Sequence, residues 1–281
     1  MADITTRPGR HEPEPIRRAP RPLPFPLNIY QTSVGRKWVM ALTGLGLLGF
    51  VLVHMIGNLH IYEGPTQMHE YAETLRDLGG HLIPRTVLLW IMRLGLIAMF
   101  ALHIHSAYTL KERSRKASES AGYMSGQKKY AGGQDYIAAN YASRTMRWTG
   151  PIIALFILFH LADLTWGWFS DDWVRGDPYH NVVNSLSNLP VAILYVVANL
   201  ALALHIFHGG WSMFQSLGIN NPRYNGARQA IAAGLALVIL VGNLSFPLMV
   251  QAEVINEDNR DCPVGEFEEC LHDGAAAPGE G

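Results

Sequence analysis

Charged side chains are scarce in this sequence: Asp, Glu, Lys and Arg make up 16% of its 281 residues, whereas hydrophobic residues make up 49%. Charge is nearly absent from five apolar stretches, close to residues 38–62, 86–110, 148–169, 189–214 and 230–250. A helix needs roughly 20 residues to cross a hydrocarbon core of about 30 Å, and each stretch is that long. These runs lack the alternation of barrel strands, and backbone in lipid must satisfy its own hydrogen bonds. We therefore predict an all-α protein, an integral membrane bundle of five helices.

The motifs of soluble enzymes are absent as well. The sequence contains no glycine-rich phosphate loop, nucleophile elbow or metalloprotease helix, and no basic patch interleaved with aromatics. We expect no soluble catalytic domain and no nucleic-acid partner. Residues 1–26 are rich in Pro and Arg without an apolar run, which predicts a cytoplasmic arm rather than a signal peptide. Residues 27–250 form the predicted membrane domain, and the acidic residues 251–281 form an external tail.

Lys and Arg are rare on one side of the predicted membrane. Seventeen of the 22 lie before the first apolar stretch, up to Lys37, or in the segments that follow the second and fourth apolar stretches, and four lie in the segments on the other side. Loops rich in Lys and Arg stay in the cytoplasm. We therefore predict a multi-pass protein of the cell's inner (plasma) membrane, with a cytoplasmic N-terminus and an external C-terminus.

Histidine is the main ionisable residue inside the predicted spans. The spans contain His54 in the first, His103 and His105 in the second, His160 in the third, and His205 and His208 in the fourth. Because successive helices reverse direction, the histidines of the first and third spans fall in the outer half of the membrane and the other four in the inner half. Such residues are costly in lipid and usually functional, and two imidazoles on facing helices can ligate a haem. The pattern predicts two cofactor layers, although hydrogen bonding between helices is the alternative for any single histidine.

The sequence around these histidines resembles a known family. The stretch TSVGRKWVMALTGLGLLGFVLVHMIGNLHIY, residues 32–62, is similar to the opening of the single-chain, five-helix B-type cytochrome b subunit of succinate dehydrogenases and fumarate reductases, in an actinobacterial-like form. The similarity continues in order through ALHIHSAYTLKERSRKA, SRTMRWTGPIIALFILFHLADL and HIFHGGWSMFQSLGINNPRY, so that it covers about residues 30–250.

The resemblance implies that the chain is the membrane anchor of succinate:quinone oxidoreductase, respiratory complex II of the tricarboxylic acid cycle. Such an anchor carries one or two b haems and passes electrons from an iron-sulfur subunit to quinone or menaquinone, so that quinone reduction takes place on it. The flavoprotein and iron-sulfur subunits would dock on the cytoplasmic face. The sequence leaves the oligomeric state open, and a homo-oligomer of the complex in membrane lipid is one option.

Carried over by motif, the outer haem would be held by His54 and His160, and the inner one by His208 with a histidine of the second span. His103 and His105 point about 200° apart on a helix, so only one of them can face that haem. His205 lies one turn before His208 and would support a ligand, replace one, or line a quinone pocket.

Polar side chains that could bond a quinone lie near both ends of the bundle. The inner candidates are Ser33, Arg36, Trp211, Ser212 and Gln215, and the outer candidates are Asp163 and Trp166. The alternative for each is ordinary anchoring at the membrane interface.

Only two cysteines are present, Cys262 and Cys270, both in the predicted external tail. A disulfide is one interpretation, because that compartment is oxidising, and two free thiols without a role are another. With His272 or the outer histidines they also match the ligand types of a Rieske-type [2Fe-2S] cluster in place of a haem, although the usual two-box spacing is absent. Two further functions stay open: a histidine-lined proton or metal transporter, and the cytochrome b anchor of another respiratory oxidoreductase.

Overall fold

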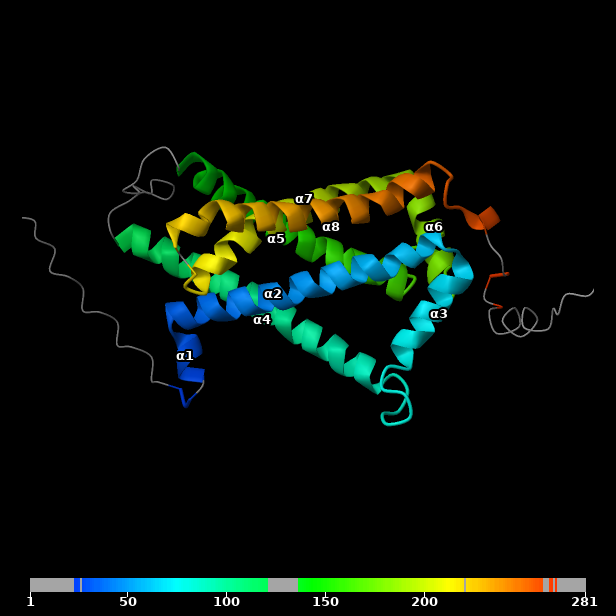
Figure 1. The fold of residues 1–281 in the computed structure, drawn as a ribbon, viewed down its shortest axis with the longest axis horizontal. Coiled ribbons are helices and arrows are strands. Elements are labelled where there is room, and N and C mark those ends of the chain that lie inside the picture. Colours follow the sequence, from blue (N-terminus) through cyan, green and yellow to red (C-terminus); the bar gives the residue numbers. More distant parts are fainter. Residues whose placement is uncertain are drawn as a thin grey trace, which may run out of the picture.

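The structure is a bundle of long helices (Figure 1). The computed structural model describes residues 23–25, 27–120, 136–219, 221–259, 263–264 and 266, and of residues 117–120 and 136–144 it describes only the backbone. Five helices are long and apolar enough to cross a membrane: α2 (Ser33–Asn58), α4 (Val87–Ser120), α5 (Tyr136–His160), α7 (Leu189–Ser216) and α8 (Asn225–Gln251). The prediction of an all-α protein with five membrane-length helices is confirmed, and no strand occurs in the described residues.

Short helices lie at the two ends of the bundle. At one end, α1 (Leu27–Gln31) precedes α2, and we call this end the α1 end. At the other end lie α3 (Pro65–Arg76) and α6 (Pro178–Ser187), and we call it the α6 end (Figure 1). Turns η1 (Leu59–Tyr62), η2 (Leu161–Thr165), η3 (Pro222–Tyr224) and η4 (Glu257–Asn259) extend or join the helices. The second predicted span continues to Ser120 as a helix, ten residues beyond its predicted end.

Side-chain caps fix where two of the helices begin. The hydroxyl of Thr32 accepts a hydrogen bond from the backbone N–H of Gly35 at 2.9 Å, which satisfies one of the free donors of the first turn of α2. Asp177 does the same for α6, where its carboxylate accepts from His180 N at 2.9 Å and Pro178 occupies the first turn.

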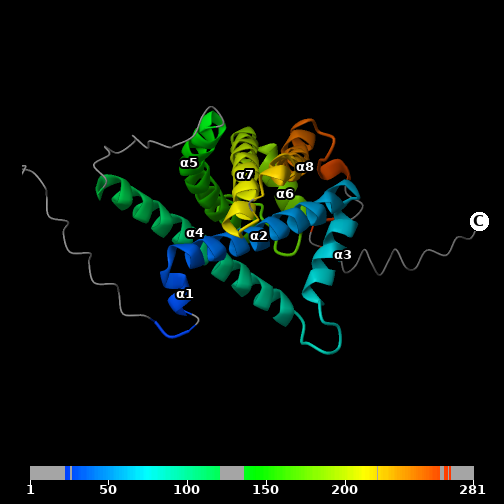
Figure 2. The same cartoon turned by 60° about the vertical axis from the view of Figure 1, so that its left-hand side comes forward.

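Small residues allow the helices to pack closely, as is usual in membranes. The α7–α8 interface is the most extensive, and buried alanines such as Ala201, Ala232 and Ala236 line it. A Cβ at Gly242 of α8 would collide with the sulfur of Met55 in α2. α4 packs mainly on α2, and its N-terminal half diverges from the other long helices in both views (Figures 1 and 2).

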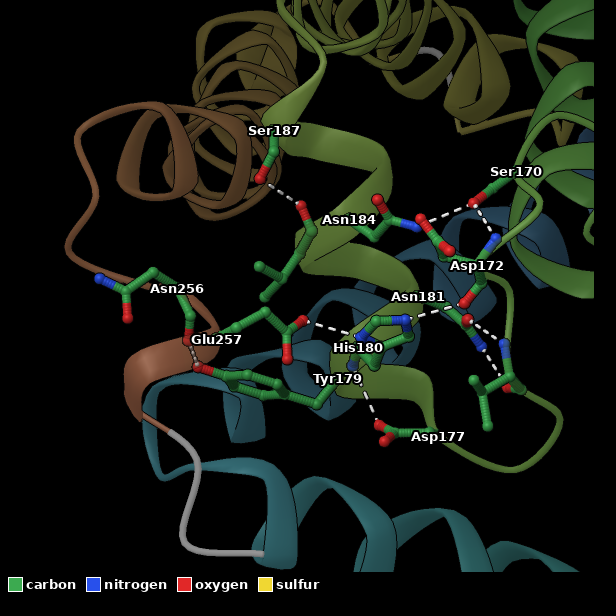
Figure 3. Close-up of polar contacts among 12 residues, drawn as sticks. Ser170, Asp172, Asp177, Tyr179, His180, Asn181, Asn184, Ser187, Asn256 and Glu257 are labelled. Carbon is green, nitrogen blue, oxygen red and sulfur yellow. Dashed lines mark hydrogen bonds and ion pairs between the residues drawn. The ribbon is translucent and has the colours of Figure 1, made fainter. Parts of the chain in front are cut away.

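A polar network ties the segment that follows α8 to α6 (Figure 3). The His180 ring lies between Glu257, 3.0 Å from Nδ1, and the backbone carbonyl of Asp172, 2.8 Å from Nε2. The buried hydroxyl of Tyr179 donates to the carbonyl of Asn256 at 2.9 Å. Beneath this network lies the main apolar core, which includes Met55, Val183, Leu186, Tyr195 and Phe246. The network therefore holds α6 against this core.

Candidate functional site

Two histidines from different helices face each other near the α6 end. The ring centroids of His54 in α2 and His160 in α5 are 6.0 Å apart, and the ring planes are nearly perpendicular at 86°. Aromatic rings surround the pair: Phe50 stacks on His54 at 5.3 Å, and Phe156 lies 5.8 Å from His160. The structure thus brings together His54 and His160, which the sequence placed in one layer, and we call this pair the α6-end layer.

A second pair of histidines lies nearer the α1 end, and we call it the α1-end layer. The rings of His103 in α4 and His205 in α7 are 6.2 Å apart, with planes at 63°. The predicted inner pair was His208 with a histidine of the second span. In the structure the ring from the second span is that of His103, and it faces His205 instead of His208. Gly44 of α2 makes room for it, since a Cβ there would lie 3.1 Å from the His103 ring.

In three of these four rings Nδ1 already has a hydrogen-bond partner. His103 Nδ1 lies 3.1 Å from the carbonyl oxygen of Met40, which can only accept, so Nδ1 carries the proton and Nε2 keeps a free electron pair. His205 Nδ1 lies 3.4 Å from the hydroxyl of Thr149, and His160 Nδ1 lies 3.2 Å from the hydroxyl of Tyr195. Metal-ligating histidines usually bond their second nitrogen in this way.

The geometry of both pairs fits a haem. Imidazole nitrogens bind transition metals at about 2 Å and the ring centroid lies about 1 Å further, so two ligands on opposite sides of one iron have centroids about 6 Å apart. No cluster of three or more metal-ligating side chains occurs in the described residues. Each pair offers two donors, and in a haem the porphyrin would supply the other four. Each pair also joins two helices whose backbones are not packed closely on each other, α2 with α5 and α4 with α7.

The remaining two histidines have other surroundings. His105 points to α1, where its Nδ1 lies 2.5 Å from the hydroxyl of Tyr30 and the two rings stack at 5.8 Å. His208 is buried, with 8% of its surface exposed, and neither ring nitrogen has a hydrogen-bond partner. Its ring centroid lies 5.1 Å from that of Phe207. A buried imidazole without a hydrogen-bond partner among the described residues, one turn from His205, can also serve as a donor to a cofactor.

A pocket of about 480 Å³ opens at the α1 end, between the start of α2 and the end of α7. Ser212 and Gln215 line it, as expected for a quinone site, together with Lys37 and Trp38. The other three inner candidates turn elsewhere. Ser33 accepts from Arg113 at 3.0 Å, Arg36 donates to the Tyr30 carbonyl at 3.1 Å, and Trp211 donates to Asn225 at 3.1 Å.

A smaller pocket of about 270 Å³ lies at the α6 end under α6. Asp163 lines it with polar residues that include Ser170, Asn184 and Ser185. The Asp163 side chain is buried, and its Oδ2 accepts hydrogen bonds from Ser185 at 2.5 Å and Tyr195 at 3.2 Å. Trp166 does not line this pocket; it is exposed and its ring lies 4.8 Å from that of Trp168.

Several residues of the site escaped the sequence analysis. Tyr195, Thr43 and Thr149 contact the histidines, but a hydroxyl inside an apolar span is also common in ordinary helix packing, so no sequence signal singles them out. The predicted roles of Cys262, Cys270 and His272 lie outside the described residues, as do most of the N-terminal arm and residues 121–135.

Comparison with known proteins gives one family match. The model of the succinate dehydrogenase/fumarate reductase transmembrane subunit family matches residues 137–242, from α5 through most of α8, which contain His160, His205 and His208. Neither the curated proteins nor the solved structures gave a match. The actinobacterial-like character of the chain is not tested by this match and stays a prediction. Through residues 137–242, the chain is similar to the succinate dehydrogenase/fumarate reductase transmembrane subunit family.

Proposed function

We propose that this chain passes electrons from the iron-sulfur subunit of complex II to quinone through cofactors held by its two histidine pairs. The observation that carries the proposal is that two imidazole pairs, each with centroids about 6 Å apart, lie in successive layers of one membrane bundle. Two such layers form a path along the bundle axis.

Each pair would hold one b haem, which supplies a one-electron carrier when bound. His54 and His160 would ligate at the α6 end, and His103 and His205 at the α1 end, with His208 as the alternative to His205. The chain orients these rings by bonding their second nitrogens, for example His103 to the Met40 carbonyl. The aromatic and aliphatic side chains around them exclude water.

The pockets at the two ends are the proposed quinone or menaquinone sites. In the α1-end pocket Lys37, Ser212 and Gln215 provide donors for a quinone carbonyl, whereas Ser33, Arg36 and Trp211 bond other groups and do not line the pocket. In the α6-end pocket Asp163 is the group that can exchange a proton, and Trp166 lies at the nearby surface. The α1-end pocket is the better candidate for reduction, because it lies on the side of the proposed electron donor.

The flavoprotein and iron-sulfur subunits would dock on the α1 end, which would face the cytoplasm. Basic side chains gather there, among them Lys37, Lys111, Arg113, Arg115 and Arg147. The plasma-membrane location and the assembly of complexes into a homo-oligomer remain part of the same proposal.

The test is single replacement of His54, His160, His103 and His205 by alanine in the intact complex. Each change should remove one haem from the reduced-minus-oxidised spectrum and lower succinate:quinone activity by at least tenfold. His105→Ala is the matched control from the same helix as His103, and it should keep both haems because its ring faces Tyr30.

Other outcomes would point elsewhere. Haem loss in His208→Ala but not in His205→Ala would restore the pair expected from the sequence. Acid-labile sulfide together with one missing haem would support the Rieske-type alternative with Cys262 and Cys270. A colourless protein would favour the transporter, and co-purification with a nickel or molybdenum enzyme would favour another respiratory oxidoreductase.

A further inference from the structure

The His160 ring begins a chain of hydrogen bonds that ends at a buried carboxylate. Its Nδ1 lies 3.2 Å from the Tyr195 hydroxyl, and that hydroxyl lies 3.2 Å from Oδ2 of Asp163. The Ser185 hydroxyl donates to the same oxygen at 2.5 Å. Four residues from α5, η2, α6 and α7 are thereby joined in one line.

The chain has a defined direction. The carboxylate accepts, so the Tyr195 hydroxyl donates its proton to Asp163 and its oxygen is left to accept from His160. His160 must therefore carry its proton on Nδ1, which leaves the electron pair on Nε2. The ring is held in the tautomer that a ligand needs.

The π-helical turn η2 makes this geometry available. It follows directly after His160, and its widened hydrogen bond runs from Trp166 N to the Leu161 carbonyl at 3.0 Å. Such turns re-aim side chains and occur often at functional sites. Here Asp163, three residues after His160, is turned to the Tyr195 hydroxyl and the wall of the α6-end pocket.

Asp163 also lacks a balancing cation. None of the ion pairs found within the described residues includes it, and its two partners are neutral hydroxyls. The partners of the α1-end pair differ, because His103 and His205 bond the Met40 carbonyl and the Thr149 hydroxyl. Of the two histidine pairs, it is the α6-end layer whose histidine is hydrogen-bonded, through a tyrosine, to a carboxylate.

We propose that Tyr195 and Asp163 are positioning residues that fix the His160 tautomer and lower the reduction potential of the centre held by His54 and His160. This inference rests on the proposed function. Negative charge relayed to Nδ1 makes a ligating imidazole more electron-rich, and an electron-rich ligand stabilises the oxidised metal. Ser185 has the opposite effect, since its hydrogen bond draws charge away from the Tyr195 side.

The experiment is a redox titration of the purified complex, following the spectrum of the centre that His54→Ala and His160→Ala abolish. Tyr195→Phe and Asp163→Asn should move its midpoint to a more positive potential while cofactor content stays at the wild-type level. Ser185→Ala should move it to a more negative potential. General loosening of the site would move all three variants in one direction, so opposite signs identify the relay.

Thr149→Val is the matched control, because it removes a hydroxyl from the other histidine pair and should leave this midpoint unchanged. Unchanged midpoints in both Tyr195→Phe and Asp163→Asn would overturn the inference, as would shifts of one sign in all three variants. Failure of the proposed function itself looks different: the wild-type complex would then show no redox centre that depends on His54 and His160.

Discussion

His103 and His105 are two residues apart, yet their rings have different partners. An α-helix turns by about 200° over two residues, so one ring faces His205 across the bundle and the other faces Tyr30 of α1. The sequence predicted that only one of the two could face a cofactor. Which one depends on the rotation of α4 about its axis, and that is set by packing on α2, where Gly44 admits the His103 ring.

Gly57 permits another close contact in α2, and it provides a stability test. It is buried, and a Cβ there would collide with the Tyr71 ring of α3, so Gly57→Ala should lower the free energy of unfolding by about 1 to 3 kcal/mol. The measurement is thermal unfolding of the detergent-solubilised complex. Gly49→Ala in the same helix is the control, because nothing lies within 4 Å of its added Cβ. Equal melting temperatures for the two variants would contradict the contact.

The helices differ in how well the sequence foretells them. Five long apolar runs predict the five spans, because hydropathy alone decides whether a segment enters lipid. The 12-residue helix α3 and the 10-residue helix α6 escaped notice, since they are short and mix polar with apolar side chains. Their helical state depends on caps and on contacts with distant segments.

The candidate site shows the same division. Histidine positions and span directions predict two layers, and His54 with His160 meet as expected. The choice of His205 over His208 opposite His103 could not be predicted, because it depends on the rotation of α7. The π-helical turn η2 has no sequence signature either, so the link from His160 through Tyr195 to Asp163 emerges only in three dimensions.

Capping of α6 can be tested at Asp177, which is fully buried (Figure 3). Asp177→Ala removes the acceptor of the His180 N–H and should destabilise α6 by about 1 to 2 kcal/mol. Faster amide hydrogen exchange over residues 178–187 is the expected readout. Asp171→Ala, at an exposed position of the same loop, is the control and should leave the exchange rates as they are. Equal protection in both variants would show that packing alone holds the helix.

The two ends of the molecule differ in charge. In the described residues, Arg76, Arg85 and Arg175 lie at the α6 end, where the first two pair with Glu73. The α1 end carries many more Lys and Arg side chains, spread over the start of α2, the end of α4, α5, η3 and the start of α8. In membrane proteins the end with more Lys and Arg residues usually faces the cytoplasm, and this excess favours the α1 end. The same end would then receive electrons, and the α6-end pocket would open to the outside.

This orientation can be measured by labelling single cysteines in intact cells with a membrane-impermeant maleimide. In a background with Cys262→Ser and Cys270→Ser, Leu82→Cys places a thiol between α3 and α4, where the side chain is 94% exposed. Tyr224→Cys places one at the other end, between α7 and α8, where the side chain is 55% exposed. Leu82→Cys should react in intact cells, whereas Tyr224→Cys should react only after permeabilisation. The reverse pattern would put the α6 end in the cytoplasm, and the docking face proposed for the iron-sulfur subunit would then be wrong, because electrons from succinate could not reach the α1-end histidines first.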